Sequence, residues 1–141
     1  MRLVPLRRWV FANGIFISLG DSNVWGLSGG LILSSIPELS DRELHGLLSC
    51  AGRPVIVACF TQSCVPCKRM LPMLEDLGRR FSNRLKIVRM DVEKYPVIAT
   101  TYDIAAVPTL LIVVDGTVRE RVVGVVVLKD LLRKALEYAS V

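Results

Sequence analysis

The feature that most constrains this chain is a pair of cysteines, Cys64 and Cys67, that lies between two strongly patterned segments. Residues 54–60, before the pair, form a continuous apolar run rich in β-branched side chains, which is typical of a strand buried on both faces. Apolar residues recur at helical spacing after the pair, at Met70, Leu71, Leu74, Leu77 and Phe81. The cysteines are therefore predicted to lie where a central strand ends and a long amphipathic helix begins.

The start of a helix is a position that favours a reactive thiol. Backbone N–H groups and the positive end of the helix dipole point at the first sulfur, and Lys68 and Arg69 add positive charge nearby. Pro66 suits the opening turn of a helix, because its missing N–H would have no intrahelical partner there. The arrangement fits thiol–disulfide exchange, in which a thiolate attacks a disulfide and a second thiol resolves the mixed intermediate.

A static disulfide, two ordinary buried thiols and a zinc site are the alternatives for the same pair. Tetrahedral zinc needs four ligands, but the sequence has no second C-x-x-C, and its lone His45 falls on another predicted element, so no metal is expected. His45 is expected on a helix surface. Cys59 belongs to the buried strand and is expected in the core. Cys50 lies near a predicted helix end, where an accessible thiol could serve a regulatory or intermolecular role.

The rest of the sequence alternates helix and strand patterns. A capping box from Ser40 to Glu43 predicts a short helix with an apolar face, and Asp115-Gly116 between apolar runs predicts a hairpin. The other expected elements are a strand over 85–92, a short helix over 94–102, strands over 109–114 and 117–123, and a final helix with the apolar stripe Leu128, Leu131, Leu132, Ala135 and Leu136. The sequence predicts an α/β domain with a mixed four- to five-stranded sheet and helices on both faces.

The composition changes near residue 40, although 141 residues suit a single globular domain. Residues 1–39 carry few charges and are predicted to be an N-terminal extension, and residues 40–141 the catalytic domain. The basic start and the uncharged stretch over 9–19 leave open three interpretations of residues 1–20: a poorly ordered or locally packed extension, a targeting segment, or an anchor.

A set of short motifs resembles the thioredoxin family. They are FTQSCVPCK over 60–68, Pro72, AVPTL over 106–110, Asp115-Gly116 and Gly124. The resemblance spans roughly residues 40–141 and implies the thioredoxin fold. It also implies that Cys64 is the exposed nucleophile, that Cys67 is the buried resolving thiol and that Pro108 follows a cis peptide bond. The substrate would bind along a groove that comprises Val65, Pro66, Val107, Pro108 and Gly124.

The chain departs from the family pattern around the cysteines. Ser63 stands where the family usually has tryptophan, and Val65 replaces the usual glycine between the cysteines. Ala58 stands where these proteins usually keep a buried aspartate that relays a proton to or from the resolving cysteine. Arg89 occupies the position of that aspartate's usual lysine neighbour. We therefore expect the acid–base part of the mechanism to differ in this chain.

The resemblance implies a cytoplasmic protein-disulfide reductase that needs no cofactor, acts on disulfide-containing client proteins and is recycled by a partner reductase. One alternative is an exported, membrane-tethered or organellar thiol oxidoreductase, if residues 1–20 are a targeting segment. Another is a redox-weak client-binding module, motivated by Ala58 and Ser63. The formal charge of +5 is spread along the chain, so no nucleic-acid partner is expected. Membrane binding is not expected either, and the protein is expected to be a monomer.

Overall fold

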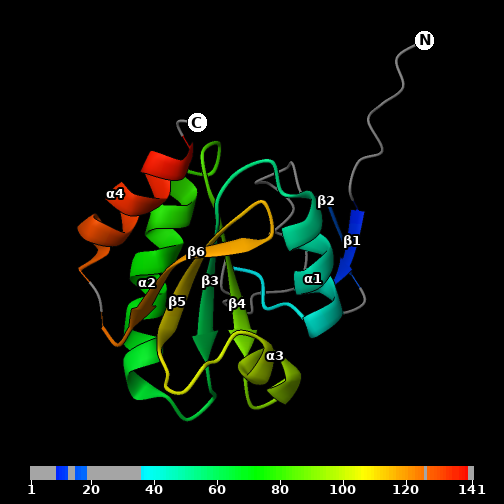
Figure 1. Cartoon of the computed structure of the whole chain (residues 1–141), viewed down its shortest axis with the longest axis vertical. Helices are drawn as coiled ribbons and strands as arrows, with labels where there is room; N and C mark the ends of the chain where they lie inside the picture. Colours follow the sequence, from blue (N-terminus) through cyan, green and yellow to red (C-terminus); the bar gives the residue numbers. More distant parts are fainter. Residues whose placement is uncertain (1–8, 13–14, 19–35, 126, 140–141) are drawn as a thin grey trace. The chain divides into compact units, whose positions relative to one another are not determined.

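The computed structural model describes residues 9–12, 15–18, 36–125 and 127–139 (Figure 1). It divides into two compact units, Met1–Ser35 and Ile36–Val141. Within the first unit, β1 (Trp9–Ala12) and β2 (Ile15–Ser18) pair as a two-stranded antiparallel sheet. The second unit contains both cysteines of the predicted redox pair.

The second unit begins at Ile36, and its first residues already pair with the main sheet before the first helix. The Arg89 N–H donates to the carbonyl of Pro37 at 2.9 Å, and the Leu39 N–H donates to the carbonyl of Arg89 at 3.0 Å. Glu38 thus forms an isolated parallel bridge with Arg89. These contacts add a short parallel segment to one edge of the main sheet.

The main sheet has four strands in the order β4-β3-β5-β6. Its central strand, β3 (Val55–Phe60), runs parallel to β4 (Lys86–Asp91) and antiparallel to β5 (Thr109–Val114), and β6 (Thr117–Val123) pairs antiparallel with β5. The predicted mixed sheet is therefore confirmed. Residues 55–59 of β3 are all buried, as expected for a strand covered on both faces.

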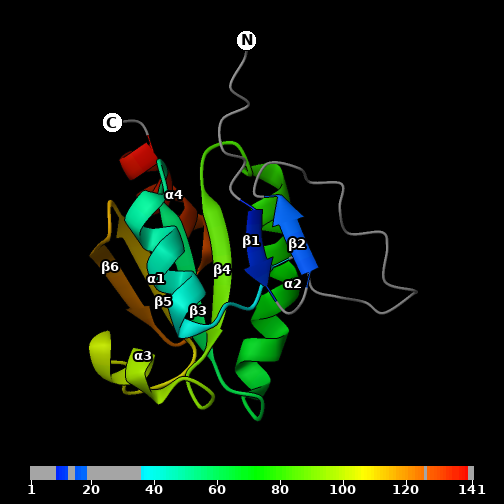
Figure 2. The ribbon, with the colours of Figure 1, turned by 90° about the vertical axis from the view of Figure 1, so that its right-hand side faces the viewer.

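Helices cover both faces of this sheet (Figures 1 and 2). α2 (Val65–Arg80) and α4 (Leu128–Ala139) pack on one face, in a core that includes Ile56 and Ala58 of β3. α1 (Asp41–Cys50) and α3 (Pro96–Thr101) pack on the other, against Val55, Val57 and Cys59. The alternation of side chains along β3 thus divides the core between the two faces. None of the helices in the described residues is long and apolar enough to cross a membrane.

The predicted local signals appear where the sequence placed them. Ser40 caps α1, with the Glu43 N–H donating to its hydroxyl at 3.3 Å and its own N–H donating to the Glu43 carboxylate at 2.7 Å. Asp115 and Gly116 turn the chain between β5 and β6 with φ values of 50° and 77°. Two consecutive residues in the left-handed region form a turn whose twist matches that of the flanking strands.

Replacement of Gly116 by alanine is expected to lower the free energy of unfolding by about 1–2 kcal/mol, because a Cβ disfavours the left-handed backbone. Gly46→Ala is the matched control: Gly46 lies inside α1, a Cβ there would meet no atom within 4 Å, and the change should raise stability by about 0.5–1 kcal/mol. Urea unfolding of both variants measures the difference. Equal effects of the two substitutions would contradict the assigned turn.

Candidate active site

The two cysteines lie at the junction of β3 and α2, where the sequence placed them. Cys64 is the N-cap residue of α2, and its sulfur accepts a hydrogen bond from the Cys67 N–H at 3.2 Å. The two residues form a disulfide, with their Cα atoms 5.3 Å apart. Pro66 lies in the first turn of the helix. The free N–H groups and dipole of that turn stabilise negative charge on the Cys64 sulfur once the bond is reduced.

The expected difference in exposure between the two cysteines is reversed in the oxidised structure. Cys64 is only 9% exposed, whereas Cys67 is half-buried. The reason is local, because the Cys64 side chain turns back over the helix end to cap the Cys67 N–H. The description of Cys64 as the exposed residue is therefore corrected for this state, and its position at the helix N-terminus is what distinguishes it from Cys67.

A cis proline, Pro108, lines the same hollow as Cys67 of the disulfide. The Val107–Pro108 peptide bond is cis, as the resemblance implied. Pro108 is buried and Val107 half-buried, and the Gly124 N–H donates to the Pro108 carbonyl at 2.8 Å. The buried Thr109 hydroxyl donates to the Ala106 carbonyl at 2.6 Å, which fixes the segment before β5. The structure thus joins Pro108 and Gly124, which are distant in sequence.

Large apolar side chains are exposed near the segments that carry the predicted groove residues. Val65, between the cysteines, is 53% exposed, and Pro66 is exposed as well. Val123 and Val125 flank Gly124 and are 59% and 73% exposed. Sequence reasoning missed these two valines, because their apolar character alone predicts burial.

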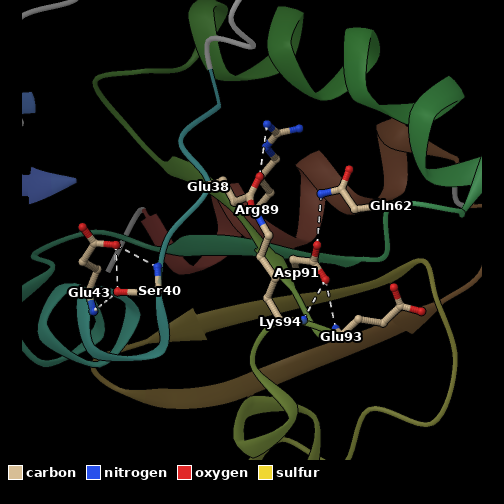
Figure 3. A network of polar contacts seen from close by, with 8 residues as sticks. All are labelled: Glu38, Ser40, Glu43, Gln62, Arg89, Asp91, Glu93 and Lys94. Carbon is tan, nitrogen blue, oxygen red and sulfur yellow. Dashed lines mark hydrogen bonds and ion pairs between the residues drawn. The ribbon is translucent and has the colours of Figure 1, made fainter. Parts of the chain in front are cut away.

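A buried carboxylate, Asp91, ties the loop before Cys64 to the end of β4 (Figure 3). It accepts hydrogen bonds from the Gln62 side chain at 3.0 Å and from the backbone N–H groups of Glu93 and Lys94 at 2.9 and 3.1 Å. Sequence reasoning missed this residue. The sequence signal that could have revealed it is its position as an acidic residue at the end of an apolar strand. A carboxylate buried there needs hydrogen-bond donors.

The hydrogen bonds around Asp91 determine its ionisation. Burial by itself would raise the pKa of this carboxyl, but the bonds from Gln62, Lys94 and Glu93, together with the charge of Lys94, lower the pKa below its ordinary value. Asp91 is therefore a carboxylate at neutral pH, in the form that accepts all three hydrogen bonds.

The remaining cysteines lie where the sequence predicted them. Cys59 is 1% exposed, and burial raises its pKa to about 12, with a smaller opposing effect from the charge of Arg121. It therefore stays protonated and unreactive. Cys50 is exposed at the end of α1, and His45 is exposed on the same helix. Within the described ranges, no three His, Cys, Asp or Glu side chains gather as metal ligands.

A hollow of about 100 Å³ lies beside Cys67 and is lined by residues of β3, β4, β5 and α2. Its wall includes Ala58, Cys67, Lys68, Arg89 and Pro108. The structure thus brings together Ala58 and Arg89, the two departures from the family pattern, beside the sulfur-bearing residue Cys67.

Acidification should remove the stabilising effect of Asp91. A carboxyl with a depressed folded-state pKa stabilises the fold above its unfolded pKa of about 4, and this stability is lost as the pH falls through the folded pKa. Asp91→Asn, which puts an N–H₂ group opposite the Gln62 donor, should therefore lower stability at pH 7 and progressively less in acid. Urea unfolding across pH measures this, with Asp76→Asn, an exposed carboxylate on α2, as the control. A destabilisation that is independent of pH would contradict the role of the ionised form.

Comparison with known proteins agrees with this geometry. The thioredoxin family model matches residues 35–137. Thioredoxin Y1, chloroplastic, of Arabidopsis thaliana is 34% identical over 92 residues, covering 65% of this chain and 54% of that protein. A thioredoxin-like protein of Synechocystis is 37% identical over 79 residues, covering 56% of this chain and 75% of that protein. The chain therefore spans between about half and three quarters of these relatives' lengths.

A solved structure shows the same fold. A mutant thioredoxin from Halobacterium salinarum superposes with a TM-score of 0.68 at 24% sequence identity, covering 75% of this chain and 91% of that one. The strand order, the disulfide at the start of α2, the cis proline and the matched family model agree. This chain belongs to the thioredoxin family.

Proposed function

We propose that this chain is a protein-disulfide reductase that works by dithiol–disulfide exchange through Cys64 and Cys67. The observation that carries the proposal is the Cys64–Cys67 disulfide at the N-terminus of α2, together with the cis bond before Pro108, which lines the same hollow as Cys67. The helix end favours a thiolate at Cys64, and Cys67 is close enough to close the ring. Relatives named thioredoxin support the same activity.

The exchange proceeds in two steps. The reduced Cys64 thiolate attacks one sulfur of a client disulfide, forms a mixed disulfide and releases the other client sulfur as a thiolate, which takes a proton from solvent. Cys67 then loses its proton and attacks the Cys64 sulfur. The Cys64–Cys67 bond forms, the bond to the client breaks, and the client leaves with both of its sulfurs reduced. A partner reductase must return two electrons to the pair before the next cycle.

The groove beside the disulfide is proposed to bind an extended client segment. The residues that would line it are Val65, Pro66, Val107, Pro108 and Gly124. Two features support this: φ at Gly124 is 87°, and a Cβ there would meet nothing within 4 Å, so a client backbone could approach closely. The exposed side chains of Val65, Val123 and Val125 favour clients with apolar residues next to the cysteine.

Dithiothreitol-dependent reduction of insulin separates this activity from the alternative of a redox-weak binding module, which Ala58 favours because no carboxylate stands at that position. Acceleration over a control without protein supports the reductase. A rate equal to that control would leave only the binding module.

The remaining proposals concern the chain as a whole. We place the redox domain in residues 40–141, preceded by an extension over residues 1–39, and expect a monomer. An organellar location is favoured over a cytoplasmic one by the relatives named chloroplastic, with residues 1–20 as the targeting segment. The mass of the mature protein from its own cells tests this, because a chain that starts near Asp21 would show processing.

The two cysteines should give opposite results in a trapping experiment. Cys67→Ser should accumulate mixed disulfides with clients, because attack by Cys64 survives and resolution does not, whereas Cys64→Ser should trap none. Non-reducing electrophoresis followed by mass spectrometry identifies the adducts. Cys50→Ser, which removes an exposed thiol outside the site, is the control and should behave like the unchanged protein. Equal trapping by both active-site variants would contradict the assignment of Cys64 as the nucleophile and Cys67 as the resolving thiol.

A further inference from the structure

The hollow of about 100 Å³ beside Cys67 can be reached from solvent. Its wall includes Ala58 of the central strand β3, which is 8% exposed, whereas the neighbouring Val57 and Cys59 are each 1% exposed. The exposed Lys68 side chain also lines the hollow, so one part of its wall lies at the protein surface. A small dissolved molecule therefore has a way to the middle of the buried strand.

The wall of the hollow is mostly apolar. Besides Ala58, its apolar side chains are Phe60, Met70, Leu71, Leu74 and Leu110. The Gln62 side chain lines it too, but its amide already donates to the Asp91 carboxylate at 3.0 Å (Figure 3). An ordered water needs about two to four polar partners, and a poorly hydrated apolar pocket instead favours an apolar ligand.

The charged side chains of the wall favour an anion. Lys68 and Arg89 line the hollow, and none of the described residues in its wall is acidic. Arg89 is paired with the Glu38 carboxylate at 3.5 Å, whereas Lys68 has no ion-pair partner in the part of the chain that is described. Cys59 stays neutral, because burial raises its pKa to about 12. The uncompensated charge at the hollow is therefore the Lys68 ammonium.

We propose that this hollow binds a small monocarboxylate, with the apolar body of the ligand beside Ala58 and its carboxylate paired with Lys68. An apolar cavity of about 150 Å³ holds benzene, so about 100 Å³ has room for a body of roughly three to four carbons. The ligand lies against Cys67, one of the two residues of the redox pair. The binding is noncovalent and does not depend on the proposed exchange function.

The first test compares three probes on the unchanged, oxidised full chain, with backbone amide shifts in nuclear magnetic resonance as the readout. Titration with 2-methylpropanoate should shift the amides of Ala58 and Leu110 and reach saturation. Acetate, which is two carbons smaller, should bind about tenfold more weakly, because it buries less apolar surface. The neutral amide 2-methylpropanamide has the same shape and should bind about fivefold more weakly, because it cannot form the ion pair.

The second test repeats the titrations on variants of the wall. Ala58→Val adds two methyl groups to the hollow and should weaken the carboxylate and the amide alike, by about tenfold. Lys68→Gln should abolish the preference for the carboxylate over the amide and leave the affinity for the amide unchanged. Lys129→Gln, at an exposed lysine of α4, is the matched control and should keep the preference.

The outcomes decide the proposal without reference to turnover. It is supported if Lys68→Gln alone removes the preference for the carboxylate and Ala58→Val weakens both probes. It is overturned if no shift saturates, if acetate binds as tightly as 2-methylpropanoate, or if the carboxylate and the amide bind equally to the unchanged protein. An effect of Lys129→Gln equal to that of Lys68→Gln would also overturn it, because the preference would then reflect net charge. If Ala58→Val does not fold, the probe comparison and Lys68→Gln still decide.

Discussion

The burial of β3 on both faces is the constraint on which the rest of the domain depends. The β3 side chains on one face of the sheet pack in a core with α2 and α4, and those on the other face pack in a core with α1 and α3. The strand ends at Phe60 and α2 begins at Val65, so a short loop joins the fixed strand to the helix. The disulfide lies at that turn. A rigid scaffold thus positions a reactive group that a flexible loop could not hold.

Local signals were sufficient to predict most of this architecture. The capping box at Ser40, the apolar run before Cys64 and the Asp115-Gly116 turn each specify one conformation with a short-range physical cause. The pairing of segments that are distant in sequence was harder to predict. The contacts of residues 37–39 with β4 are backbone bonds to a strand about fifty residues away, and neither segment carries a side-chain pattern that indicates them.

In the candidate site, too, some features could be predicted from the sequence and others could not. The cysteines were predictable, because a short motif with a specific chemistry carries them, whereas the cis bond before Pro108 was implied only by the resemblance to the family. Asp91 was not, since its role depends on Gln62 and two backbone N–H groups that only the folded chain brings to it. Nor was the hollow, because the substitution at Ala58 shows that a carboxylate is missing but says nothing of whether neighbours fill the space. Side-chain packing, rather than local propensity, decides such features.

The two edges of the main sheet are protected in different ways. Residues 37–39 cover the β4 edge with backbone hydrogen bonds, whereas β6 is the opposite edge of the sheet in the part of the chain that is described. β6 carries Arg119, Glu120 and Arg121 in its middle, and Glu120 is paired with Lys134 of α4 at 3.0 Å. A second copy that paired with this edge in the antiparallel register centred on Glu120 would place Glu120 opposite Glu120 and Arg119 opposite Arg121, and these charges would have to be desolvated. Charge on β6 therefore opposes edge-to-edge aggregation in that register, which matters for a protein that exposes several valines, one of them Val123 at the end of β6.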